Sequence, residues 1–134
     1  MAMESDQEKL NGRKKYKILI VDDEVEVNRF LKTLLNLEGF EVYTAFTGLD
    51  AVNLVKENNF DLVILDIGLP DLNGIEVGKR MRKETKQDIP ICIITAQTEI
   101  QNVINAFGLG VEGYVVKPFD IDELLKKIQE ILDR

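Results

Sequence analysis

Short apolar runs alternate with longer amphipathic stretches along most of this chain. Three of the runs are nearly continuous and rich in β-branched residues, which is typical of strands buried on both faces of a sheet. The other two are weaker but are bounded by turn-forming residues. The pattern therefore predicts five strands: YKILIV (16–21), FEVYTAF (40–46), FDLVILD (60–66), IPICIIT (89–95) and EGYVVK (112–117).

The stretches between the runs have the spacing of helices. After the first run, apolar residues recur at helical intervals from Val27 to Leu35, and Gly39 is expected to end this helix. The same reasoning predicts helices over about 49–57, 75–84 and 99–107. The last helix has the clearest signal, because Asp120 and Glu123 form a capping-box-like pair ahead of an apolar face that reaches Leu132.

Five strand–helix units in succession predict an α/β fold with a parallel sheet and helices on both faces. Right-handed crossovers leave few topologies, and the doubly wound, flavodoxin-like strand order 2-1-3-4-5 is the expected one. With 134 residues the chain has room for one such domain. We predict a flexible N-terminal tail over residues 1–15 and one domain over 16–134.

Composition narrows the function. The apolar fraction of 45% predicts a packed core, and the formal net charge of −7 argues against binding to a nucleic-acid backbone. No apolar run is long enough for a bilayer and no signal peptide is recognisable, so a cytoplasmic location is expected. The chain has no histidine, so any phosphohistidine in its chemistry has to belong to a partner.

Polar and charged residues stand where the predicted strands end. Asp22 and Asp23 follow the first strand, Asp66 ends the third, Thr95 ends the fourth and Lys117 ends the fifth. Ligands of open parallel sheets bind beyond these carboxyl ends, so the five side chains are expected in one crevice. Each alone has an ordinary interpretation, such as a helix cap, a strand threonine or a solvated lysine. Their coincidence at four strand ends favours a site.

The charges in this crevice predict a metal ion. Two carboxylates about 4 Å apart repel by roughly 4 kcal/mol at an effective dielectric of 20, and one ammonium offsets only part of that repulsion among three acids. Mg²⁺ prefers oxygen ligands and commonly binds one or two carboxylates beside a phosphate. No G-x-G-x-x-G or P-loop pattern is present, which argues against a nucleotide site.

Four segments together resemble bacterial two-component response-regulator receiver domains, the chemotaxis-protein-like members among them: KILIVDDE, LVILDIGLPDLNGIEV, IPICIITA and GYVVKPFD. The resemblance covers residues from about 16 to 134. It implies that Asp66 is the phosphoacceptor. It also implies that Asp23 and Asp66 bind Mg²⁺ through their side chains, Asp22 mainly through water, and Gly68 through its backbone carbonyl.

The resemblance also implies how the phosphoryl group is held and sensed. Lys117 is expected to pair with it, and Thr95 and the backbone N–H of Ala96 to donate hydrogen bonds to it. Tyr114 is the expected aromatic switch residue, turning inward when Thr95 moves. The Lys117–Pro118 bond is expected to be cis on this basis, although X–Pro bonds are usually trans.

The expected partners are a sensor histidine kinase or histidine phosphotransfer protein, and a downstream protein target or a fused output domain. No direct binding to nucleic acid or membrane is expected. The expected output face, which also offers a dimer contact, combines 99–107, 112–117 and the last helix. Departures from the family pattern at 111–113, together with nearby glycines, predict mobility between 108 and 113.

On this reading the chain is a phosphoacceptor regulator and not an enzyme. Two alternatives remain open. One is a receiver-like interaction module without phosphorylation, although such modules usually lack an acid, the threonine or the lysine. The other is a Mg²⁺-dependent aspartyl phosphatase, but the segment VDDEVEV after the first strand lacks the threonine of the D-x-D-x-T pattern.

Overall fold

The computed structural model describes residues 15–85, 87–96 and 108–133. Its five strands form one parallel sheet in the order β2-β1-β3-β4-β5, which confirms the predicted doubly wound, flavodoxin-like fold. The strands are β1 (Lys17–Val21), β2 (Glu41–Ala45), β3 (Leu62–Asp66), β4 (Ile91–Thr95) and β5 (Gly113–Val116). The helices of the described residues are α2 (Val25–Leu37), α3 (Gly48–Glu57), α4 (Gly74–Thr85) and α6 (Ile121–Leu132).

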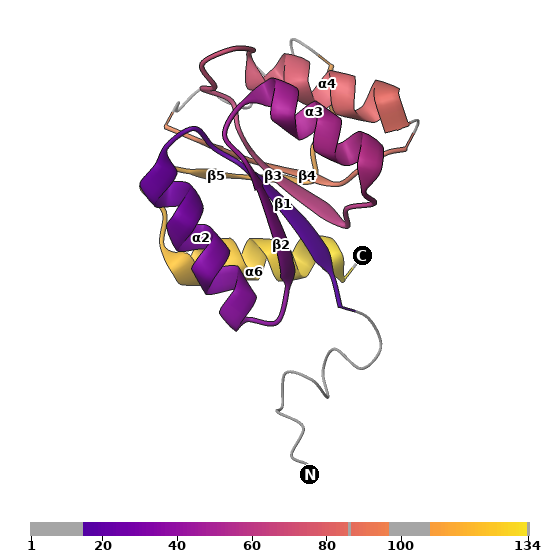
Figure 1. Cartoon of the computed structure of the whole chain (residues 1–134). Helices are drawn as coiled ribbons and strands as arrows, with labels where there is room; N and C mark the ends of the chain where they lie inside the picture. Colours follow the sequence, from indigo (N-terminus) through magenta and orange to yellow (C-terminus); the bar gives the residue numbers. More distant parts are fainter. Residues whose placement is uncertain (1–14, 86, 97–107, 134) are drawn as a thin grey trace.

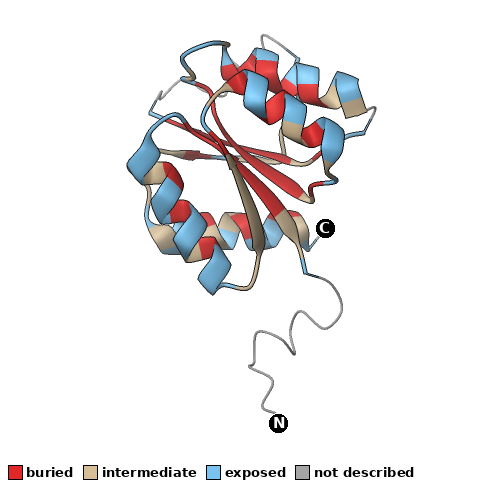
Figure 2. Cartoon of the chain, viewed as in Figure 1, coloured by how far each residue is buried: buried red, intermediate tan, exposed pale blue. Residues whose placement is uncertain are grey.

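Two helical layers enclose the sheet. α3 and α4 cover one face, and α2 and α6 cover the other (Figure 1). Successive strand residues point to opposite faces, so in β1 Leu19 and Val21 join the core under α3 and α4, whereas Ile18 and Ile20 join the core under α2 and α6. Figure 2 shows the central strands as buried and β2 at the edge as half-buried. The near-continuous apolar runs therefore correspond to strands that are buried on both faces, as predicted.

Local signals explain where the helices begin and end. Gly39, with φ of 97°, follows α2 in the left-handed conformation that glycine adopts without strain. Thr47 caps α3 and Asp120 caps α6, each accepting a hydrogen bond from a backbone N–H of the first turn. The strands are one or two residues shorter than the predicted runs. Pro90, for example, has no N–H to donate and precedes β4.

The segment before β5, which the sequence predicts to be mobile, makes several contacts with α4 and β4. Leu109 is buried, and the Arg82 guanidinium donates to the carbonyl oxygens of Ile89 and Gly110 and to the Glu112 carboxylate, 3.2 Å away. Glu112 in turn accepts a 2.7 Å hydrogen bond from the N–H of Ile91. These bonds link α4, β4 and residues 110–112. The predicted helix at 99–107 and residues 1–14 of the predicted tail (1–15) lie outside the described residues.

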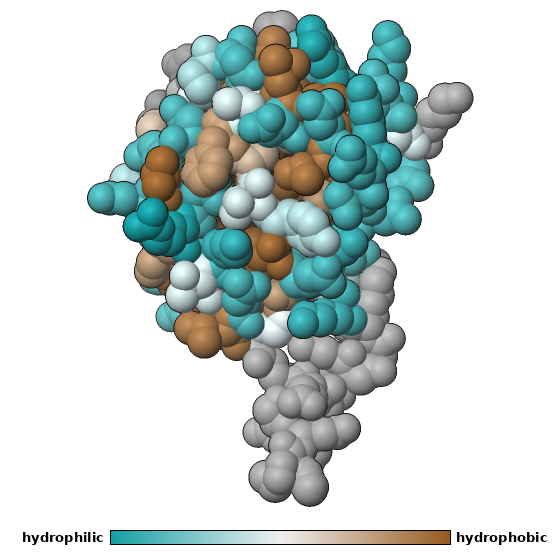
Figure 3. All heavy atoms as spheres, in the orientation of Figure 1, coloured by the Kyte–Doolittle hydropathy of each residue, from teal (hydrophilic) through white to brown (hydrophobic). Residues whose placement is uncertain are grey.

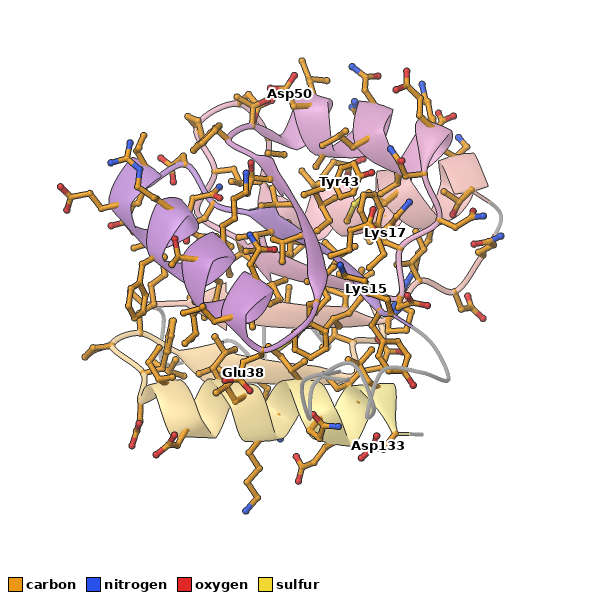
Figure 4. The ribbon with its side chains drawn as sticks, turned by 60° about the horizontal axis from the view of Figure 1, so that its bottom comes forward. Lys15, Lys17, Glu38, Tyr43, Asp50 and Asp133 are labelled. Atoms are coloured by element: carbon orange, nitrogen blue, oxygen red, sulfur yellow. The ribbon has the colours of Figure 1, made fainter. Side chains whose placement is uncertain are left out.

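A lysine and two aromatic residues pack together at the edge of the sheet away from the acid cluster. Figure 4 shows Lys17 and Tyr43 side by side there; the ammonium lies 5.2 Å from the ring centroid, and Tyr43 packs edge-on against Phe60. In the view of Figure 3, hydrophobic residues are scattered among hydrophilic ones, as on most protein surfaces. None of the helices in the described ranges has both the length and the apolarity needed to span a bilayer.

Candidate functional site

Three carboxylates meet at the carboxyl ends of β1 and β3. One oxygen from each of Asp22, Asp23 and Asp66 lies within 4.8 Å of the other two. Asp22 and Asp66 are buried, and Asp23 is exposed. Neighbouring parallel strands end at the same edge of the sheet, which is why residues from positions 22 and 66 come together. The sequence predicted this juxtaposition.

The backbone at Asp22 is fixed by a buried amide. The N–H of Asp22 donates to the carbonyl oxygen of Ala45, and the side-chain amide of Asn28 donates to the carbonyl oxygens of both Asp22 and Ala45, at 3.0 and 3.1 Å. Asn28 is 1% exposed and lies on the inner face of α2. Sequence reasoning missed it. A polar residue one position after Val27, within an otherwise apolar helix face, was the available signal.

A close approach of two chain segments positions Asp66. Its Oδ1 accepts a 2.9 Å hydrogen bond from the N–H of Gly68. A Cβ added at Gly74 would lie 2.3 Å from Cα of Ile67 and 2.8 Å from the carbonyl oxygen of Asp66, so only glycine allows this contact. The N–H of Gly74 also donates to the carbonyl oxygen of Ile67. The start of α4 is therefore packed directly against the end of β3.

A carboxylate in the loop after β3 joins this loop to α3. Asp71 accepts hydrogen bonds from the N–H groups of Gly48 and Leu49, at 2.9 and 3.1 Å. The bond from Gly48, followed by that from Leu49, lowers the pKa of Asp71. These bonds place residues 67–73 between the acid cluster and the first turn of α3. Sequence reasoning treated the loop as a turn and missed this bond.

Lys117 reaches into the cluster from the end of β5. Its N–H donates to the carbonyl oxygen of Thr95, and its Nζ lies 3.0 Å from Asp22 Oδ2 and 3.3 Å from Asp66 Oδ2. The third partner of Nζ is Glu24 Oε1 at 2.9 Å, a contact that sequence reasoning did not anticipate. The Lys117–Pro118 peptide bond is cis, the isomer that the family resemblance implied.

The electrostatic balance of the site leaves excess negative charge. Burial raises the pKa of Asp22; the Glu24 N–H and Lys117 offset part of this effect, and Asp66 adds to it. Burial alone would lower the pKa of Lys117, but the carboxylates of Glu24, Asp22 and Asp66 outweigh it and raise the pKa above its ordinary value. One ammonium thus pairs with three carboxylates, and the Lys117 side chain stays protonated.

The donor set fits a hard divalent cation. Three carboxylate oxygens, two of them from buried residues, are gathered at one point, and oxygen ligands with room for water are what Mg²⁺ requires. Gly68 lies next to the cluster, with its N–H bonded to Asp66, and it is exposed. A softer metal would favour nitrogen or sulfur ligands, and the chain has no histidine.

The residues expected to bind and sense a phosphoryl group lie along β4 and β5. Asp66 pairs with Ile94, so Thr95 ends β4 one position beyond it; Thr95 is 2% exposed, and Ala96 follows at the surface. Tyr114 pairs with Ile93, two residues before Thr95, and is 41% exposed. The tyrosine therefore stands outside the core, on the strand beside the threonine.

Comparison with known proteins decides the family. The family model of the response regulator receiver domain matches residues 18–129, which include the carboxyl ends of all five strands. This chain belongs to the response-regulator receiver domain family. The family assignment drawn from the four sequence segments is confirmed.

Two kinds of relative support the assignment. Response regulator ArlR of Staphylococcus aureus is 41% identical over 117 residues, which cover 87% of this chain and 52% of that protein. The chain thus spans about half the length of the curated relatives it matches. A CheY-like receiver domain from Methanospirillum hungatei superposes with a TM-score of 0.82 at 31% identity, covering 90% of this chain and 95% of that one.

A further solved structure bears on the metal. Response regulator protein TrrA from Thermotoga maritima is 38% identical and superposes with a TM-score of 0.77, covering 87% of this chain and 99% of that one. That protein was solved in complex with Mg²⁺ and beryllium fluoride. The acid cluster of the receiver domain described above stands on the same fold.

Proposed function

We propose that this receiver domain is a phosphoacceptor switch of a two-component system, and that Asp66 takes a phosphoryl group from a phosphohistidine of a partner. The observation that carries this proposal is the buried Asp66 carboxylate, which shares a cation-ready cluster with two further acids and lies 3.3 Å from the Lys117 ammonium. One ammonium does not balance these acids, so the surplus favours a divalent cation, and a cation bound there could in turn hold a phosphoryl group.

The transfer step uses an Asp66 carboxylate oxygen as nucleophile. An electron pair of this oxygen forms a P–O bond while the P–N bond of the phosphohistidine breaks. The electron pair of the P–N bond leaves with the imidazole of the partner. Mg²⁺, when bound by Asp22, Asp23, Asp66 and the Gly68 carbonyl, would neutralise charge on the phosphoryl oxygens. Lys117 holds a phosphoryl oxygen through its ammonium, which stays charged because neighbouring carboxylates raise its pKa.

The modified site changes the strands beside it. The acyl phosphate carries a charge approaching −2 at neutral pH, and it draws the Thr95 hydroxyl, with the N–H of Ala96, toward its oxygens. Thr95 is buried and Tyr114 is exposed on the adjacent strand, so movement of the first gives the second room to turn inward. The proposed output face is β5 with α6 and the predicted helix at 99–107, where a target or a second copy would bind.

Partners follow from the same chemistry. The donor is a sensor histidine kinase or a histidine phosphotransfer protein, because the chain has no histidine of its own. The downstream partner is a protein target or an output domain, and the domain acts in the cytoplasm. The chain works as a regulator that is modified once per signalling event, and does not turn over a diffusible substrate.

The decisive experiment is phosphorylation with acetyl phosphate and Mg²⁺, followed by separation of the phosphorylated form on a phosphate-affinity gel. Wild type is expected to shift, Asp66→Asn to lose the shift, and the matched exposed-acid control Asp88→Asn to keep it. A shift that survives in Asp66→Asn would refute the assignment. Absence of any shift would favour the interaction module, and sustained hydrolysis of a phosphate ester would favour the phosphatase.

A further inference from the structure

The Lys117 ammonium has no spare hydrogen bond. An ammonium carries three N–H donors, and three carboxylate oxygens surround Nζ: Glu24 at 2.9 Å, Asp22 at 3.0 Å and Asp66 at 3.3 Å. A phosphoryl oxygen that binds Lys117 must therefore replace one of these partners. The question is which carboxylate leaves.

The three partners differ in how firmly they are held. Asp22 is fully buried, and its second oxygen accepts a 2.9 Å hydrogen bond from the N–H of Glu24. Asp66 carries the incoming group. The Glu24 side chain is 60% exposed. Glu24 precedes the first turn of α2 but its side chain makes no capping hydrogen bond there, so Lys117 is the partner that holds it over the site.

We propose that Glu24 is an internal stand-in for the phosphoryl group, which occupies Lys117 while Asp66 is unmodified and leaves when the group arrives. The inference rests on the proposed function and adds a residue that regulates it. Glu24 is the displaceable partner because an exposed carboxylate regains its hydration on leaving, whereas a buried one does not. The contact keeps the lysine aimed at Asp66 and also competes with the ligand.

Competition predicts that removing the Glu24 charge favours phosphoryl binding. In Glu24→Gln the ammonium keeps Asp22 and Asp66, and its third partner becomes a neutral amide that competes less well with an anion. Beryllium fluoride at saturating Mg²⁺ is therefore expected to bind about two- to fivefold more tightly, the range of an exposed ion pair. Glu26→Gln is the matched control. It removes the same charge from the first turn of the same helix, but Glu26 is not a partner of Lys117, and its effect is expected to be smaller.

The test is isothermal titration of the full chain, first with Mg²⁺ alone and then with beryllium fluoride at saturating Mg²⁺. A second readout follows the side-chain carboxyl carbon of Glu24 by NMR, which is expected to change its chemical shift in the wild type when beryllium fluoride binds. Equal affinity in Glu24→Gln and wild type, or an equal gain in Glu26→Gln, would overturn the inference. So would a tenfold loss of Mg²⁺ affinity in Glu24→Gln, which would make Glu24 a metal ligand.

Failure of the proposed function gives a different result. A wild-type chain that binds no beryllium fluoride and takes no phosphoryl group on Asp66 overturns both proposals together. A wild type that binds it, with no gain in Glu24→Gln, overturns the stand-in role alone.

Discussion

Replacing Asp66 by asparagine should make the metal-free protein more stable. Asp66 lies within 4.8 Å of carboxylate oxygens of Asp22 and Asp23, so each of these pairs repels by at least about 3.5 kcal/mol at an effective dielectric of 20. Lys117, at 3.3 Å, returns about 5 kcal/mol of attraction on the same scale. The net repulsion is about 2 kcal/mol, and solvent screening at the exposed Asp23 reduces the expected gain to about 1–2 kcal/mol.

Asparagine suits this test because its side-chain oxygen keeps the hydrogen bond from the N–H of Gly68. The free energy of unfolding is measured by urea denaturation, followed by circular dichroism, once in EDTA and once with Mg²⁺. Wild type is expected to gain stability from Mg²⁺ by mass action, and Asp66→Asn to gain much less. The advantage of the variant should therefore shrink or reverse when the metal is added.

The control is Asp88→Asn, which removes an exposed carboxylate from the loop before β4 and should leave stability nearly unchanged in both conditions. An Asp66→Asn protein that is no more stable than wild type in EDTA would refute the electrostatic reasoning. An equal Mg²⁺ effect in the two proteins would show that the ion binds elsewhere.

Three further predictions follow from other contacts. Arg82→Lys keeps the charge but loses the planar guanidinium that binds Ile89 and Glu112, so urea denaturation should show a free energy of unfolding lower by about 1–2 kcal/mol. An unchanged free energy of unfolding would show that these hydrogen bonds do not stabilise the fold. Burial raises the pKa of Asp22 above 3.8; the folded state therefore holds that proton more tightly, and the associated stability is lost as pH rises through the folded pKa. In EDTA, wild type should lose stability relative to Asp22→Asn as the pH rises above 3.8, and parallel curves would contradict this. A Cβ at Gly68 meets only Asp66 Oδ1, at 3.6 Å, so Gly68→Asn should fold normally. The larger side chain should shield the phosphoryl group from water and slow its loss after acetyl phosphate is removed. An unchanged rate of loss would show that water arrives from another side.

Several features of the fold followed directly from residue pattern. Apolar runs such as that of β3 were recognisable because strands buried on both faces need apolar residues at every position. Asp120 and Gly39 marked helix ends because capping and left-handed backbone select few residue types. The contacts of the segment before β5 had no such signal, because a hydrogen bond joins Arg82 to Glu112 and neither residue indicates the other in the sequence.

The sequence by itself determined which chemical groups stand at the strand ends, and the rule for parallel sheets brought Asp22, Asp66 and Lys117 to one edge. Only the tertiary structure decided the remaining contacts of the site. Lys117 and Glu24 are 93 residues apart and meet at 2.9 Å, and the amide of Asn28 bridges two carbonyl oxygens from different strand ends. Periodicity reports which face a residue lies on, but hydrogen bonds depend on distances of a few tenths of an ångström between segments that the chain brings together only when it folds.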